Sequence, residues 1–190
     1  MERRHSFFPG SFRTRAEPDG KKYIEGYFVV FNQRTELWPG VYEEIDPGAL
    51  DSSLGKDLRC LYNHNDDLVL GRSSAGTFTV RKDEHGIFGC VEINENDSTA
   101  LDIYARVQRG DVSGCSYGYW PIREETITLD DGGVLYRELE VDAIEMSVCP
   151  FPAYPQTEIQ ARKKDFESGA ARKRDALKIE IKERLEKLKC

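Results

Sequence analysis

Three side chains in this sequence could together carry out acyl transfer: a histidine, a serine and an acid. His64 follows a short apolar segment and precedes polar residues, a position that presents a side chain rather than packing it. Ser116 lies between Gly114 and Gly118, which let the backbone bend or a substrate come close. Glu145 interrupts an apolar segment. A serine becomes a nucleophile only when a base removes its proton and a third group orients that base.

Each of these residues also has an ordinary structural explanation. A histidine at a strand end is more often a surface residue than a base, and a serine between glycines is usually a small residue in a crowded strand. An acid in an apolar strand can simply be paired with an arginine. Cys115 adjoins Ser116 and is an alternative nucleophile, but neighbours in a strand point to opposite faces. Only one of the two can therefore face His64.

A metal site is less favoured by the spacing of the potential ligands. His64, Asp66 and Asp67 could bind a cation, yet no second histidine or cysteine stands at ligand spacing. His5 and His85 lie in turn-rich segments and are expected to be solvated. The five cysteines have no CxxC spacing, and this pattern predicts free thiols in a reducing cytoplasm. We therefore expect no metal and no other cofactor.

The elements that must position these side chains are mostly strands. Aromatic and β-branched residues predict strands over 23–31, 41–45, 58–63, 77–81, 87–93, 112–122, 134–141 and 144–149. A polar loop is expected at 64–67 and a short helical stretch at 49–54. One longer helix is predicted from Asp97 or Ser98 to about Arg109, ending at Gly110. Its apolar face is expected to carry Leu101, Tyr104, Ala105 and Gln108.

Composition and charge divide the 190-residue chain into parts. The net charge is −7, which argues against a general nucleic-acid binder, and no apolar stretch is long enough for a membrane span or a signal peptide. Residues 161–190 hold eleven Lys and Arg against six Asp and Glu, a net +5, whereas residues 1–160 carry −12. We predict a flexible segment over 1–22, a folded domain over 23–155, and a basic linker with a helical tail over 156–190. A narrow apolar stripe marks that tail: Leu177, Ile181, Leu185 and Leu188.

Five short motifs add a resemblance to these patterns: 26–32, 43–50, 61–65 followed by 70–71, 110–119 and 144–153. Their order and residue patterns resemble those of the phage prohead, or capsid-maturation, serine protease family, whose fold is similar to that of the herpesvirus assemblin proteases. The resemblance spans about residues 23 to 154. Small departures are Leu50 where phenylalanine is common, Asn65 where aspartate is common, and Tyr117 where isoleucine is common.

The resemblance implies a fold and a set of catalytic roles. The fold would be mostly β with helices (α+β), an assemblin-like closed β-barrel flanked by helices, with a C-terminal charged helix added. By the same resemblance His64 is the general base, Ser116 the nucleophile and Glu145 the third member of the triad.

The resemblance also implies a role in phage assembly. The chain would be a serine endopeptidase, made in the host cytoplasm, that cleaves the scaffold region of the phage major coat protein, and itself, inside the procapsid. A homodimer is a family-level expectation, and no specific nucleic acid is expected as a partner. The alternative is a non-enzymatic scaffold or capsid-interior protein of the same fold. The basic tail would dock on an acidic or helical scaffold segment.

Overall fold

The computed structural model describes residues 3–8 and 12–150 of the chain, with backbone alone for the last two residues of the first range. They lie in the first of two compact units, Met1–Tyr154; the second unit is Pro155–Cys190. The predicted basic tail at 156–190 falls outside the described residues, so it stays a prediction. Within the described part the chain is mostly β, with a single α-helix, as the sequence predicts. No helix described here is long and apolar enough to cross a membrane.

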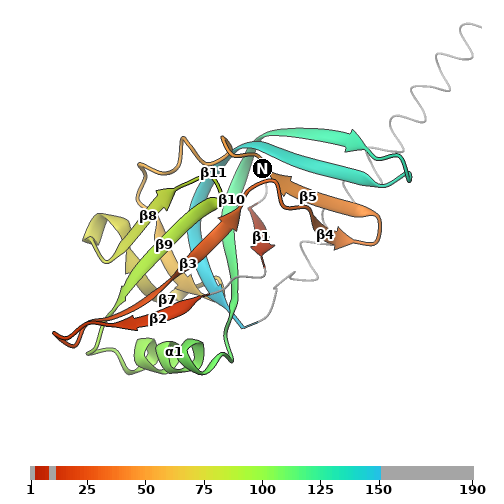
Figure 1. The fold of residues 1–190 in the computed structure, drawn as a ribbon. Helices are drawn as coiled ribbons and strands as arrows, with labels where there is room; N and C mark the ends of the chain where they lie inside the picture. Colours follow the sequence, from red (N-terminus) through yellow and green to blue (C-terminus); the bar gives the residue numbers. More distant parts are fainter. Residues whose placement is uncertain (1–2, 9–11, 151–190) are drawn as a thin grey trace, which may run out of the picture. The chain divides into compact units, whose positions relative to one another are not determined.

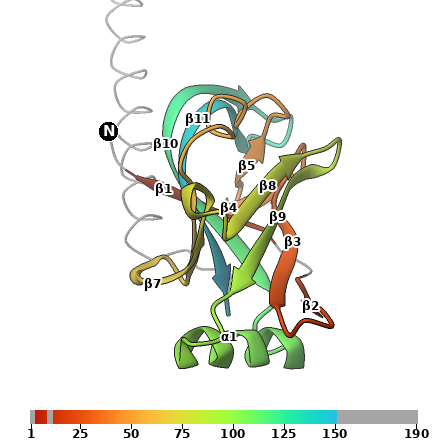
Figure 2. The ribbon, with the colours of Figure 1, turned by 90° about the vertical axis from the view of Figure 1, so that its left-hand side faces the viewer.

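The strands form two sheets that face each other (Figures 1 and 2). The larger sheet has seven strands: β1 (Arg4–Phe8), β10 (Gly114–Thr128), β11 (Val134–Cys149), β5 (Val41–Ile45), β4 (Thr35–Trp38), β6 (Arg59–Tyr62) and β7 (Asn65–Arg72). The smaller sheet has four: β2 (Arg13–Ala16), β3 (Lys22–Val30), β9 (Gly86–Ile93) and β8 (Phe78–Lys82). A 3-10 turn, η1 (Ser73–Ala75), joins β7 to β8.

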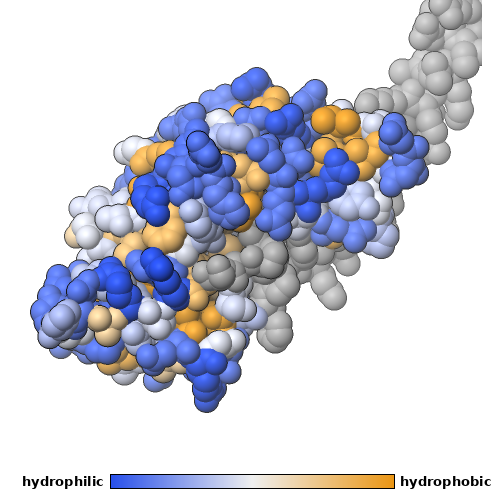
Figure 3. All heavy atoms as spheres, viewed as in Figure 1, coloured by the Kyte–Doolittle hydropathy of each residue, from blue (hydrophilic) through white to orange (hydrophobic). Residues whose placement is uncertain are grey.

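The two sheets bury one hydrophobic core between them. β10 contacts β3 and β7 contacts β9, and side chains of both sheets join the same cluster, including Phe28, Val91, Tyr117 and Met146. The hydrogen-bonded pairings of the described strands leave both sheets open. The closed barrel is therefore not confirmed, although the mostly β class is. Figure 3 shows a mainly hydrophilic surface on one face, with hydrophobic residues in small separate patches.

The helix α1 (Ser98–Arg109) has the predicted bounds but a different buried face. Asp97 caps it by accepting hydrogen bonds from the backbone amides of Thr99 and Ala100, and Gly110 ends it with a left-handed backbone, φ 89°. The buried residues are Ala100, Ile103, Tyr104 and Val107, whereas Ala105 and Gln108 are exposed. Two stripes of the helix share Tyr104. The stripe with Ile103 and Val107 offers more apolar area, and it is the one that packs inward.

The strand β11 is continuous, although two strands are predicted there. It pairs in parallel with β5 at its start and with β6 at its end, while β10 runs antiparallel along its whole length. Between β5 and β6 the Ser53 hydroxyl donates to the Val141 carbonyl and accepts from the Ala143 amide, at 3.0 and 2.9 Å. Residues 47–55 form turns, so the helical stretch predicted at 49–54 is wrong, and these turns place Ser53 beside β11.

The N-terminal segment contains two strands, β1 and β2, where a flexible segment is predicted. β1 runs antiparallel to β10 at the edge of the larger sheet, with Arg4 opposite Tyr119 and Phe8 opposite Cys115 (Figure 1). Its sequence, RHSFF, has three polar residues followed by two adjacent phenylalanines, so it lacks the apolar alternation that predicts a buried strand. It is held instead by ion pairs to acids far along the chain.

Candidate active site

His64 lies in a two-residue turn between β6 and β7. Asn63 and His64 both have left-handed backbones, with φ of 53° and 58°, as a tight hairpin turn of this kind requires. The Asn63 amide donates to the Val148 carbonyl at 3.0 Å, and the His64 amide donates to the Ser147 hydroxyl at 3.1 Å. The predicted polar loop at 64–67 is therefore this turn followed by β7. The turn fixes the histidine against β11.

Glu145 on β11 orients that histidine. Its side chain is 1% exposed, and its Oε1 lies 2.7 Å from Nδ1 of His64. A carboxylate there accepts the Nδ1 proton, which leaves Nε2 as the basic nitrogen of the neutral ring. The Ser147 hydroxyl donates to the other oxygen, Oε2, at 2.7 Å. The structure thus brings together His64 and Glu145, two of the three predicted site residues.

The carboxyl group of Glu145 is held in its charged form. Burial raises its pKa, but the hydrogen bond and charge of His64, the Ser147 hydroxyl and the charge of Arg3 act in the opposite direction. The result is a pKa below the ordinary value of 4.5. A buried acid that stays ionised can stabilise a positive charge on the neighbouring ring.

Ser116 shares a face of the larger sheet with this pair. It stands opposite Ser147, and Gly118, two residues on, stands opposite Glu145. Residues directly opposite one another, and residues two apart, lie on the same face of a sheet. Cys115 therefore faces the other way, as the sequence predicts for the competing nucleophile. The absence of a side chain at Gly118 matters, because a Cβ there would overlap Oε1 of Glu145.

The described cysteines are free thiols, as predicted for this composition. Two of them lie close enough to Glu145 to be affected by its charge. Burial, reinforced by that charge, raises the pKa of Cys60 well above its usual range and that of Cys149 to about 12. Both stay protonated at neutral pH and are poor nucleophiles.

The hydroxyl of Ser116 is hydrogen-bonded to β1 and not to the histidine. It donates to the backbone carbonyl of Ser6 on β1 at 2.8 Å, and Ser116 is fully buried. Nε2 of His64 is also buried and makes no hydrogen bond within the described part of the chain. The structure thus places all three predicted residues on one side of the sheet without joining the serine to the base.

Two residues that the sequence reasoning missed complete the site: His5 on β1, and Arg3 immediately before that strand. His5 lies against His64 with 4.0 Å between ring centroids, and its Nε2 is 3.7 Å from Oε1 of Glu145. Arg3 approaches the same oxygen with Nη2 at 3.0 Å. The expectation that His5 is solvated is wrong, since its side chain is 11% exposed. The available signal was the alternation of Arg3 and His5, which puts both on one face of a strand.

The described part of the chain holds one group of side chains that offers three potential metal ligands. One ligand atom each from His5, His64 and Glu145 lies within 4.8 Å of the others. The guanidinium of Arg3 already supplies a positive charge at this carboxylate. A cation bound there would lie beside the arginine and be repelled by it, so the arrangement fits an ion-paired acid better than a metal centre.

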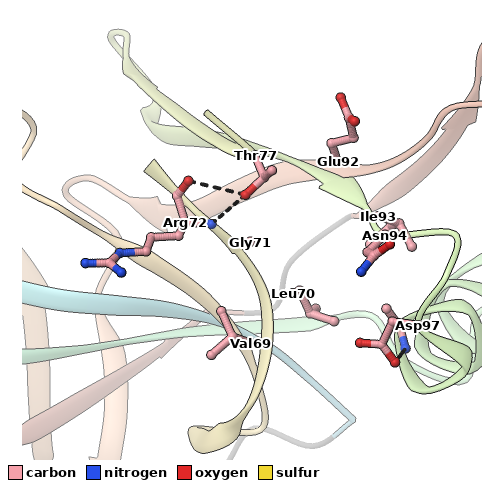
Figure 4. Close-up of a pocket in the computed structure, with 10 residues that line it drawn as sticks. Val69, Leu70, Gly71, Arg72, Thr77, Glu92, Ile93, Asn94 and Asp97 are labelled. Atoms are coloured by element: carbon pink, nitrogen blue, oxygen red, sulfur yellow. Dashed lines mark hydrogen bonds between the residues drawn. The ribbon is translucent and has the colours of Figure 1, made fainter. Parts of the chain in front are cut away.

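A pocket of about 350 Å³ lies elsewhere, between β7, β9 and the start of α1 (Figure 4). Its lining residues include Leu70, Ile93 and Asp97, and the triad candidates are not among them. In Figure 4 the Thr77 hydroxyl accepts from the Arg72 amide and donates to the Arg72 carbonyl, which holds the end of β7 in place.

The sequence is similar to a family of known proteins. The sequence model of a family described as caudovirus prohead serine protease matches residues 11–172. The chain is 31% identical over 150 residues to the prohead protease of Enterobacteria phage HK97, an alignment that covers 76% of this chain and 62% of that protein. The chain thus spans less than two thirds of that relative's length. No solved structure matches significantly.

Proposed function

Because the chain belongs to the caudovirus prohead serine protease family, we propose that it is a serine endopeptidase with the triad Ser116, His64 and Glu145. One observation carries the assignment: Nδ1 of His64 lies 2.7 Å from a buried, ionised Glu145, on the sheet face that carries Ser116. A histidine oriented by an acid beside a serine is the arrangement that nucleophilic acyl transfer requires.

The proposed chemistry assigns one task to each residue. The Ser116 oxygen attacks the carbonyl carbon of a peptide bond, and Nε2 of His64 takes the serine proton. The same proton then goes to the leaving amine, and a water molecule, activated by His64, releases the acyl group from Ser116. Glu145 keeps the Nδ1 proton in place and stabilises the charged ring.

The proposed substrate follows from the family. We place the scaffold region of the phage major coat protein first, and the chain itself second, as substrates cut inside the procapsid after synthesis in the host cytoplasm. The relative named above is itself called a prohead protease. A homodimer and the assemblin-like closed barrel belong to the same proposal, and the core shared by the two sheets supports a barrel-like arrangement.

The competing function, a non-enzymatic scaffold or capsid-interior protein, has no use for this arrangement. A buried acid paired with a histidine is not a stabilising choice over apolar side chains of similar size, because both groups must be desolvated. The pair therefore favours a catalytic purpose.

Coexpression with the coat protein tests the proposal. Ser116→Ala and His64→Ala should leave the coat protein at full length on a gel, while the parent shortens it. Ser113→Ala is the matched control, because Ser113 precedes β10 and is exposed. Circular dichroism checks that each variant folds. Processing by Ser116→Ala at the parental rate would show that the protein is not a serine protease of this kind.

The tail has a separate proposed role in packaging. Its charge of +5 over residues 161–190 suits docking to an acidic scaffold segment. Deleting 161–190 should reduce incorporation into procapsids and leave cleavage of a soluble peptide unchanged. Equal incorporation of the shortened protein would contradict this role.

A further inference from the structure

We propose that β1 is an autoinhibitory strand: it engages each member of the triad, and the site becomes competent when β1 leaves the edge of β10. The inference rests on the proposed function, since it explains how that active site is kept latent. Three successive contacts support it, one for each triad residue, and a fourth set of contacts on the opposite face of β1 explains why the strand stays in place.

The first contact occupies the hydroxyl of the nucleophile, Ser116. The Ser116 hydroxyl has a single proton, and it donates this proton to the Ser6 carbonyl at 2.8 Å. An amide carbonyl does not act as a base towards a hydroxyl, so the bond holds the proton away from His64. Because Ser116 is fully buried, a substrate carbonyl cannot approach its oxygen while β1 is present.

The second contact partly neutralises the charge of Glu145. Arg3 places Nη2 3.0 Å from Oε1 of Glu145, the oxygen that also contacts His64. During acyl transfer this carboxylate must stabilise a positively charged ring. Its charge is already balanced in part by the guanidinium, so it gives less stabilisation to His64 than an acid without that partner.

The third contact covers the base. The ring of His5 lies 4.0 Å from that of His64, and the His64 side chain is 11% exposed. Nε2, the atom that must receive the serine proton, is buried and has no hydrogen-bond partner among the described residues. Neither water nor a leaving amine reaches this atom in the structure.

The alternate residues of β1 hold the strand in register from its other face. Arg4 pairs with Glu138 at 3.1 Å and with Glu124 at 2.5 Å, and the Ser6 hydroxyl donates to Glu43. Glu138 and Glu43 are almost fully buried, and the Tyr119 hydroxyl contacts both, at 3.0 and 2.8 Å. Buried acids of this kind need such partners. The strand is thus seated by specific contacts.

β1 nevertheless lies at an edge of the sheet, so it can leave without separating the other strands. It is the edge strand of the larger sheet, and its ladder partner is β10 alone. Its departure leaves the pairing of β10 with β11 intact and exposes the edge of β10 at Ser116. An extended peptide could then pair with that edge.

A reversible lock tests the proposal. Phe8 stands opposite the native Cys115, and opposed residues of antiparallel strands have Cα atoms about 4.5–5.5 Å apart, within disulfide range. In oxidised Phe8→Cys, labelling of Ser116 by a small fluorophosphonate should fall at least tenfold, and reduction by dithiothreitol should restore it. Phe8→Cys combined with Cys115→Ser is the matched control, because it cannot form the bond. A locked protein that labels as fast as its reduced form overturns the proposal.

Removing the strand is the complementary test. Deletion of residues 2–8 should raise the labelling rate at least tenfold, and Arg4→Met, which loosens β1 without touching the triad, should raise it less. Circular dichroism establishes which variants fold; if the deletion does not, the lock alone decides. A folded deletion variant that labels no faster than the parent overturns the proposal. Failure of Ser116 to label in any variant would instead overturn the proposed function.

Discussion

Arg3 and His64 contact the same carboxylate oxygen, Oε1 of Glu145, at 3.0 and 2.7 Å. The remaining oxygen accepts from Ser147 at 2.7 Å. Three donors thus surround one acid that is almost fully buried, and they explain how it stays ionised despite the loss of water. Two of these donors, His64 and Ser147, come from the same sheet region as the acid, while Arg3 immediately precedes β1. The negative charge of Glu145 therefore stabilises two cationic or donor groups at once: the catalytic His64, and Arg3, which helps to hold β1 in place.

Glu145→Gln should lower the rate of coat-protein processing by about 10³–10⁴-fold, because a glutamine can donate to Nδ1 and favour the wrong tautomer of His64. The rate is measured by gel densitometry in a mixture of protease and coat protein. Glu140→Gln, a substitution on the same strand, should retain the parental rate. A loss of less than tenfold in Glu145→Gln would contradict the role of the acid.

The free energy of unfolding should depend on pH through Glu145. The folded-state pKa of Glu145 lies below its ordinary 4.5, so the stability it contributes is complete above that value and is lost as the pH falls through the lowered folded value. The difference in unfolding free energy between the parent and Glu145→Gln should therefore shrink in acid. Urea denaturation from about pH 7 to pH 3 measures it. A difference that stays constant would show that the acid is not ionised by its neighbours.

Ser147→Ala should impair positioning of the histidine. The hydroxyl donates to Oε2 of Glu145 and accepts from the His64 amide at 3.1 Å, so its removal takes one hydrogen bond from each of these groups. We expect a loss of about 1–3 kcal/mol in stability. The turnover number should fall with little change in KM, and Ser147→Thr, which keeps a hydroxyl, should recover part of it. A stability loss with unchanged turnover would mean that Ser147 has a structural role only.

Gly118→Ala should displace the acid. The added Cβ would overlap Oε1 of Glu145 and press on the guanidinium of Arg3. Strain of this kind in a packed interior costs about 1–3 kcal/mol, and processing activity should fall as the acid moves away from His64. Gly55→Ala is the control, because nothing lies within 4 Å of a Cβ at that position. Equal melting temperatures and activities for the two variants would contradict the close packing at Gly118.

The strands and the site residues on the large sheet could be predicted because their signals are local. The strand at 41–45 has the predicted bounds, and α1 has the predicted cap and stop. Ser116 and Glu145 lie on neighbouring strands, so alternation alone puts them on a common face once the pairing is known. His64 needed only the turn that ends β6.

The role of β1 could not be predicted, because its stability comes from distant partners. Arg3 and Glu145 are 142 residues apart, and Ser6 and Glu43 are 37 apart. The five residues RHSFF show no apolar alternation, and only the fold reveals the buried acids that they meet. The face of α1 was predicted wrongly for a related reason: two stripes were available, and packing against β2, β3 and β9 decides between them.

The left-handed backbone at His64 has a consequence for how this sequence can change. A residue other than glycine costs about 1 kcal/mol in that conformation, although asparagine and histidine are among the better tolerated. Glycine at the turn would relieve this strain, but it would also leave the buried Glu145 without its contact to His64. The two residues are therefore linked, and laboratory evolution for heat resistance without a demand for activity should replace both with uncharged side chains rather than the histidine alone.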